Sequence, residues 1–79
     1  MTTRRINFMT NDGVVARGIG DPPALGSHVT FHRDAGEPVS YRVTHVYEDW
    51  DELSKFARDM ESPGVYVPGR VNVLVEKSR

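Results

Sequence analysis

The sequence predicts a mainly β (α+β) fold: a small, partly open barrel of about five antiparallel strands with one short helix. Apolar and polar residues alternate in several short runs, which is the pattern of strands with one buried face. Clusters of Gly, Pro, Asn and Asp separate these runs and indicate turns. The 79 residues make a single domain, 1–79, because a chain of this size supports only one small core.

The N-terminal region is predicted to form a β-hairpin. Residues 4–10 alternate apolar and polar side chains, and residues 13–18 form a second β-prone run. Asn11, Asp12 and Gly13 lie between the two runs and are the residue types that tight hairpin turns require. The Gly- and Pro-rich segment that follows breaks regular structure and connects this hairpin to the next one.

A second hairpin, over residues 26–47, is the element around which the rest of the chain is organised. Residues 34–38 supply its turn, since they include a glycine and a proline. Its apolar positions are Val29, Phe31, Val39, Tyr41, Val43 and then Val46. The last step is longer than two residues, so we expect a β-bulge near Thr44 and His45. Strands that bend in this way are typical of small closed barrels.

The segment 48–61 is predicted to be the single helix, about three turns long. Its apolar side chains recur at helical spacing: Trp50, Leu53, Phe56, Ala57 and Met60. Asp49 and Glu52 match a capping box, and acidic residues favour the first turn of a helix. Ser62, Pro63 and Gly64 would end the helix.

The C-terminal region contains two β-prone segments, 65–67 and 70–76, separated by Pro68 and Gly69. The second segment is apolar on both faces for several residues. We therefore expect it to be a central strand or one that is covered on both sides.

The order of these core and turn residues resembles that of a compact SH3-like barrel. The positions that carry the resemblance are Pro23, Gly26, Val29, Tyr41-Arg42-Val43, Val46, an acidic loop with a tryptophan, and Val71-Asn72-Val73-Leu74-Val75. Short uncharacterised proteins of phages and their bacterial hosts often carry this pattern. The resemblance covers nearly the whole chain and implies a fold and a phage accessory origin, but it transfers no catalytic residue.

Composition narrows the class of protein. The net charge of −1 and the pI near 6.3 leave no global excess of positive charge for a dedicated duplex-DNA binder. With no cysteine, disulfides, zinc-thiolate sites and thiol chemistry are excluded, which suits a reducing cytoplasm. No apolar run approaches the roughly 20 residues of a membrane span, and no signal peptide is recognisable. We expect a cytoplasmic protein, in the host cytoplasm if a phage encodes it.

The residues that carry catalysis or bind metals in other proteins form no convincing set here. His28 and His32 lie about 13 Å apart if they share a strand, too far for one metal ion, whereas His45 approaches them only in some registers. A site of two histidines and a carboxylate remains the alternative to histidines that face solvent. No nucleophile motif and no calcium loop occur. We therefore predict no enzymatic activity, no cofactor and no metal.

The favoured function is that of a non-enzymatic protein-binding module with a protein partner. Its predicted contact residues are aromatic and acidic: Tyr47, Glu48, Asp49, Trp50, Asp51, Glu52 and Tyr66. For the acidic residues taken by themselves, helix capping with solvated charge is the favoured interpretation, and a partner-binding surface is the alternative. The turn at residues 34–38 and an exposed strand edge remain further candidate contact surfaces.

Two other functions stay open. The first is nucleic-acid binding by an SH3-like or KOW-like domain, which would need basic residues to gather on one face: Arg4, Arg5, Arg33, Arg42, Arg70, Lys77 and Arg79. Scattered solubilising charges are the favoured interpretation of these residues. The second is self-association into a homodimer.

Overall fold

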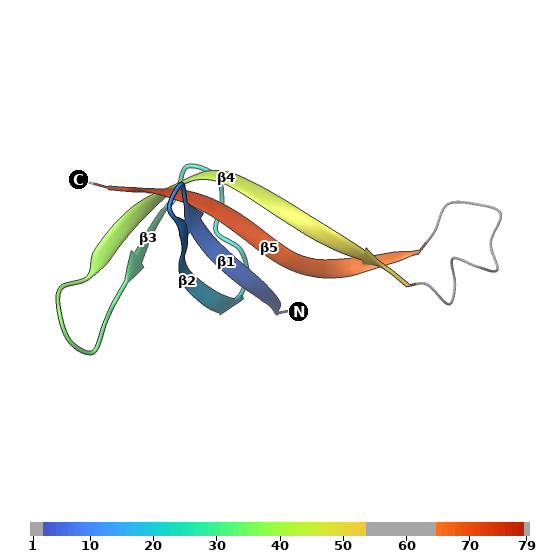
Figure 1. Cartoon of the computed structure of the whole chain (residues 1–79), viewed down its shortest axis with the longest axis horizontal. Helices are drawn as coiled ribbons and strands as arrows, with labels where there is room; N and C mark the ends of the chain where they lie inside the picture. Colours follow the sequence, from blue (N-terminus) through green and yellow to red (C-terminus); the bar gives the residue numbers. More distant parts are fainter. Residues whose placement is uncertain (1–2, 54–64, 79) are drawn as a thin grey trace.

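The computed structural model describes residues 3–53 and 65–78, which form one five-stranded sheet (Figure 1). The strands are β1 (Arg4–Thr10), β2 (Gly13–Gly20), β3 (His28–Phe31), β4 (Val39–Glu52) and β5 (Tyr66–Lys77). Their order across the sheet is β2-β1-β5-β4-β3. The sheet curls strongly into a half-barrel that is compatible with an SH3-like barrel, so the predicted β class and the number of strands are confirmed.

The direction of one strand pair differs from the prediction. The pairs β1–β2, β3–β4 and β4–β5 are antiparallel, but β1 and β5 are parallel. A period-two pattern shows which face of a sheet a side chain occupies, but it carries no information about the direction of the neighbouring strand. The expectation of a wholly antiparallel sheet is therefore wrong at this central pair.

Both predicted hairpins are confirmed. Thr10 pairs with Gly13 across the first turn, where Gly13 has a φ of 122° that favours glycine. In the second hairpin, Phe31 pairs with Val39. The predicted bulge is also present, because the register between β4 and β5 shifts between Val43 and His45.

The core lies on the inner face of the curled sheet. Its buried residues are Ile6, Phe8, Val43, Val71, Val73 and Val75. Phe31 of the edge strand β3 meets Phe8 of β1 edge to face, with ring centroids 5.0 Å apart. Phe31 also packs against Tyr41 at 5.8 Å. The contact of Phe8 with Phe31 joins two strands that are not neighbours and so holds the curl of the sheet.

The distal parts of β4 and β5 extend away from the other strands as a two-stranded ribbon (Figure 1, yellow and orange). We call this ribbon, residues 48–52 and 66–70, the arm. Its cross-strand pairs are Trp50 with Pro68, Asp51 with Val67 and Glu52 with Tyr66. The longest dimension of the molecule is 53 Å, and the radius of gyration is 16.0 Å. A compact chain of this length would have a radius of about 12 Å.

The predicted helix over 48–61 is wrong in the part that the structure describes. Residues 48–52 belong to β4, and no helix occurs in residues 3–53 or 65–78. A helix of about three turns is marginal without packing, whereas pairing with β5 satisfies the backbone of these residues. The rest of the expected helix, from residue 54 onward, lies outside the described residues. Within those residues, nothing helical is long and apolar enough to cross a membrane.

Candidate functional site

Arg4 attaches the arm to the sheet. Its side chain is on the inner face, because it alternates with buried Ile6, and is only 13% exposed. Nε and Nη2 of Arg4 donate hydrogen bonds to the Gly69 carbonyl oxygen at 3.2 and 3.0 Å. Nη2 is also 3.4 Å from the Asp49 carbonyl oxygen, to which it donates. One guanidinium of β1 thus holds the backbones of both strands of the arm.

The same guanidinium contacts two of the predicted site residues. Nη1 of Arg4 donates to Oε1 of Glu48 at 2.7 Å, which makes an ion pair. The central carbon of the guanidinium lies 6.0 Å from the ring centroid of Trp50, at the outer limit of a cation–π contact. Glu48 and Trp50 are therefore positioned by a residue more than 40 positions earlier in the chain.

Gly69 is required where the two strands of the arm approach closely. A β-carbon at this position would lie 2.7 Å from Oδ2 of Asp51 and 3.0 Å from the carbonyl oxygen of Asp49. Both distances are shorter than ordinary van der Waals contact. The β4–β5 register shifts in this region, between Glu48 and Trp50, so the glycine lies beside a bulge at the base of the arm.

One face of the arm exposes two large aromatic side chains. Paired residues of an antiparallel ribbon share a face, so Trp50 and Pro68 lie with Glu52 and Tyr66. Trp50 and Tyr66 are each 53% exposed. We call this surface the aromatic face. It is an amphipathic surface on which two large rings stand beside a carboxylate.

The other predicted site residues lie on the opposite side. Asp51 pairs with Val67 on the other face of the arm. Oδ2 of Asp49 accepts a hydrogen bond from Nδ2 of Asn72 at 3.1 Å, and Oδ1 of Asn72 accepts one from Nδ2 of Asn7 at the same distance. These bonds form a polar ladder across β1, β5 and β4. The ladder holds Asp49 on the outer face of the sheet.

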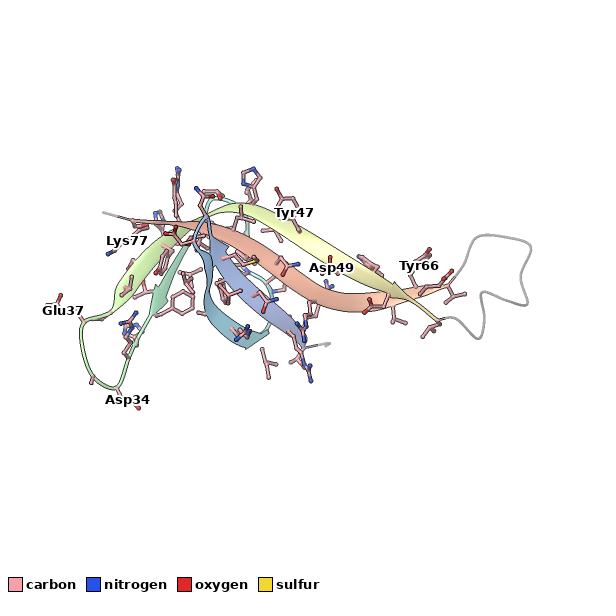
Figure 2. The ribbon with its side chains drawn as sticks, in the orientation of Figure 1. Asp34, Glu37, Tyr47, Asp49, Tyr66 and Lys77 are labelled. Carbon is pink, nitrogen blue, oxygen red and sulfur yellow. The ribbon has the colours of Figure 1, made fainter. Side chains whose placement is uncertain are left out.

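Tyr47 also belongs to the outer face, because it pairs with Asn72. Its ring is 51% exposed and stacks on that of His45, with centroids 5.9 Å apart and planes within 2°. In Figure 2, Tyr47, Asp49 and Tyr66 follow one another toward the free end of the arm, whereas Asp34 lies at the opposite end of the molecule. The predicted site is therefore divided between two faces of one ribbon.

The predicted basic residues do not gather as one patch. Arg4 binds the base of the arm through Gly69, Arg42 pairs with Glu76, and Arg33 follows β3. Arg42 and Lys77 line one hollow, and Arg79 is outside the described residues. Arg5 and Arg70 line another hollow. They share this hollow with Arg17, which the sequence interpretation did not include. The hairpin pairing of β1 with β2 could not by itself have placed Arg17 beside them, because a bulge next to Val15 shifts the register.

The three histidines lie on different parts of the sheet. His28 is in β3 opposite Arg42, His45 is in β4 opposite Leu74, and His32 follows β3. In the described part of the chain, no three side chains of His, Asp or Glu are close enough to hold a metal ion together.

The chain was compared with known proteins at the levels of sequence family, sequence and structure. No family model, no curated protein and no solved structure matches it.

Proposed function

We propose that this chain is a non-enzymatic protein-binding module and that the aromatic face of its arm is the contact surface. The observation that carries the proposal is the exposure of Trp50 and Tyr66 on one face of a ribbon that projects from the sheet. Tryptophan and tyrosine are the residue types that most often dominate binding energy in protein interfaces. Two such rings on one narrow ribbon form an anchor that an apolar pocket can receive.

The charges around these rings define the partner further. Glu52 shares the aromatic face, and Asp51 lies on the reverse of the ribbon. Arg4 lies near Trp50 but already pairs with Glu48, and Arg70 at the base of the arm belongs to the hollow that Arg5 lines. The partner is therefore a protein with an apolar pocket surrounded by Lys or Arg side chains, since complementary charge speeds and orients association.

The hydrogen bonds of Arg4 to the arm support partner binding by reducing its entropic cost. Arg4 holds the backbones at Asp49 and Gly69, on the two strands of the arm. An arm held in one orientation before the encounter loses less conformational entropy when it binds. Trp50 lies next to the Arg4 guanidinium, so its ring is the better fixed of the two.

The experiment that tests the proposal is an affinity pull-down of the tagged chain from bacterial lysate after nuclease treatment, read by mass spectrometry. The test variant is Trp50→Ala/Tyr66→Ala. The matched control is Ile19→Ala/Leu25→Ala, which removes side chains that are 78% and 68% exposed elsewhere. We expect one stoichiometric protein with the wild type and the control variant, and its loss with the test variant.

Titration of the purified partner then measures the effect. Loss of both rings should weaken binding by at least about 100-fold, as for two residues of a central interface. The charge-reversal variant Asp51→Lys/Glu52→Lys should also bind the partner more weakly than the wild type. This loss of affinity should be larger at low salt than at high salt. A partner that binds the test variant as tightly as the wild type contradicts the aromatic face as the contact surface.

Self-association gives a different result. If the chain forms a concentration-dependent dimer in sedimentation experiments, and the test variant is monomeric, the partner on the aromatic face is a second copy of the chain. That outcome would overturn the proposal of a foreign partner. The more specific idea of a phage accessory protein that modulates a host protein rests only on the spacing of core and turn residues and stays a prediction.

A further inference from the structure

The outer face of β2, β1 and β5 brings three arginines together. Arg5, Arg17 and Arg70 line one open hollow of about 320 Å³ with Ile6, Asn7, Gly18 and Ile19. No carboxylate lines this hollow. Among residues 3–53 and 65–78, none of the three guanidinium groups forms an ion pair. The chain as a whole has a net charge of −1, so this is a local concentration of positive charge.

The register explains why the three side chains converge. Ile6 pairs with Val71 in the parallel β1–β5 pair, so Arg5 and Arg70, which precede them, are neighbours on adjacent strands. Arg17 of β2 pairs with Asn7, which lies two residues beyond Arg5 on the same face of β1. Adjacent strands are about 4.8 Å apart, so all three guanidinium groups can reach one extended anion.

The acidic residues nearest to the cluster are engaged elsewhere or lie at its border. The carboxylate of Asp49 accepts its hydrogen bond from Asn72. Asp51 lies over Gly69 and lines the adjoining hollow of about 350 Å³, which also includes Arg5 and Arg70. The negative charge therefore limits the cluster on the side of the arm and leaves the side of β2 open to an anion.

An exposed aromatic ring lies across the same face. Tyr47 of β4 pairs with Asn72, which in turn pairs with Asn7 and through it with Arg17. One row across the sheet thus runs from a cation through two hydrogen-bonded amides to a tyrosine, over a distance of about 14 Å. The Tyr47 ring already stacks on His45, which holds it in a defined orientation.

We propose that this outer face binds single-stranded nucleic acid, with the three arginines on its phosphates and Tyr47 against a base. Guanidinium groups recognise phosphate oxygens with paired hydrogen bonds, and the phosphate backbone supplies most of the affinity of such interfaces. An exposed aromatic ring on a sheet stacks with an unpaired base, whose face is accessible only in a single strand. The row of arginine, amide and tyrosine side chains provides both kinds of contact on one surface.

The test measures fluorescence anisotropy of labelled oligonucleotides of about 12 nucleotides, single-stranded DNA and RNA and the matching duplex. We expect binding of a single strand in the micromolar range at low salt. Three phosphate contacts predict a slope of about −2 in log K against log salt concentration, which is about a 20-fold loss of affinity between 50 and 200 mM salt.

Two charge variants distinguish binding by the arginine cluster from non-specific electrostatic attraction. Arg5→Gln/Arg17→Gln/Arg70→Gln should bind at least about tenfold more weakly at low salt and lose most of the salt slope. The matched control is Arg33→Gln/Arg42→Gln/Lys77→Gln, which removes the same amount of charge from exposed sites elsewhere. It should keep the wild-type salt slope. Circular dichroism checks that both variants are folded.

Aromatic variants test the stacking contact. Tyr47→Ala should weaken binding about tenfold without changing the salt slope, and Tyr47→Phe should bind like the wild type. The variant Trp50→Ala/Tyr66→Ala, which alters only the aromatic face of the arm, should bind the oligonucleotide normally.

Several outcomes would overturn the proposal. One is the absence of binding by any oligonucleotide at about 50 µM protein in low salt. Equal weakening by the two charge variants is another, because it would make the binding unspecific. Equal affinity for the duplex, or equally strong competition by polyglutamate of the same charge, would likewise exclude a site for single-stranded nucleic acid.

Discussion

Arg4 and Gly69 lie 65 positions apart in the sequence, and the Arg4 guanidinium donates two hydrogen bonds to the Gly69 carbonyl oxygen, at 3.2 and 3.0 Å. The contact links the first strand to the base of the arm. Because the Arg4 side chain is largely buried, these bonds are protected from competition with water more than those of the exposed Arg42–Glu76 pair. Arg4 thus ties the base of the arm to the first strand.

Replacing Arg4 by lysine should destabilise the chain. Lysine keeps the positive charge but lacks the planar fork that contacts Gly69, Asp49 and Glu48 at once. We expect a loss of about 2 kcal/mol in the free energy of unfolding and a decrease of about 10 °C in Tm. Denaturant titration measures the loss, and the fluorescence of Trp50, the single tryptophan, reports the change at the anchor. Arg33→Lys, on the exposed β3–β4 connection, should change neither; equal stability of both variants would refute the role of Arg4.

Replacing Gly69 by alanine should also destabilise the chain, because the added methyl group overlaps Asp51 and the Asp49 carbonyl oxygen. Overpacking of this kind costs about 1–3 kcal/mol. Calorimetry of Gly69→Ala should therefore show a lower Tm. Adding Asp51→Ala should recover only part of the loss, since the backbone contact remains. Gly18→Ala is the control: its methyl group would be 3.6 Å from Phe8, an ordinary contact. A Gly69→Ala variant as stable as Gly18→Ala would contradict the close approach.

The contact between Phe8 and Phe31 should appear as an energetic coupling between β1 and β3. Edge-to-face aromatic pairs contribute about 1 kcal/mol beyond the area they bury. A double-mutant cycle of Phe8→Leu and Phe31→Leu, measured by chemical denaturation, should give a coupling of that size. The cycle of Phe8→Leu with Tyr47→Leu should be additive within about 0.5 kcal/mol. Additivity in both cycles would mean that the aromatic contact does not hold the curl of the sheet.

Hydrogen exchange should vary along β5. Residues 71–74 pair with both β1 and β4, whereas Tyr66, Val67 and Pro68 pair with β4 alone. Amides in the doubly paired part should exchange at least about tenfold more slowly than those of the arm, because the arm can open without disrupting the core. NMR-detected exchange measures this difference. Uniform protection along the strand would indicate that arm and sheet unfold together.

The arrangement of the arm could not be predicted from its own sequence. Trp50 and Leu53 recur at a spacing that suits a helix, and the acidic residues around them suit a helix N-terminus. The determining contacts come from outside this segment, from Arg4 and from the pairing of Trp50 with Pro68. Local patterns carry no information about such partners, so a short and marginal helical signal yields to long-range strand pairing.

The arginine cluster could not be predicted from the sequence because of a single irregularity in β2, the bulge next to Val15. Counting outward from the turn, with Thr10 opposite Gly13, would place Arg17 opposite Ile6 on the core face. The register instead shifts by one residue next to Val15, so that Arg17 lies opposite Asn7 on the outer face. A bulge reverses the face of every residue beyond it, and nothing in the alternation of β2 marks its position. By contrast, the bulge in β4 was predictable because the aliphatic residues themselves change phase from Val43 to Val46.

The position of β5 between β1 and β4 has a consequence for how the chain reaches its native state. The backbones of the two hairpins, β1–β2 and β3–β4, are joined through this last strand, and side chains such as Phe8 with Phe31 and Arg4 with Glu48 add direct contacts. During synthesis both hairpins leave the ribosome before their common neighbour exists. An isolated hairpin is marginal in water, so cooperative folding must wait for the final strand. The large sequence separation of the β1–β5 pair should make this last step slow compared with hairpin closure.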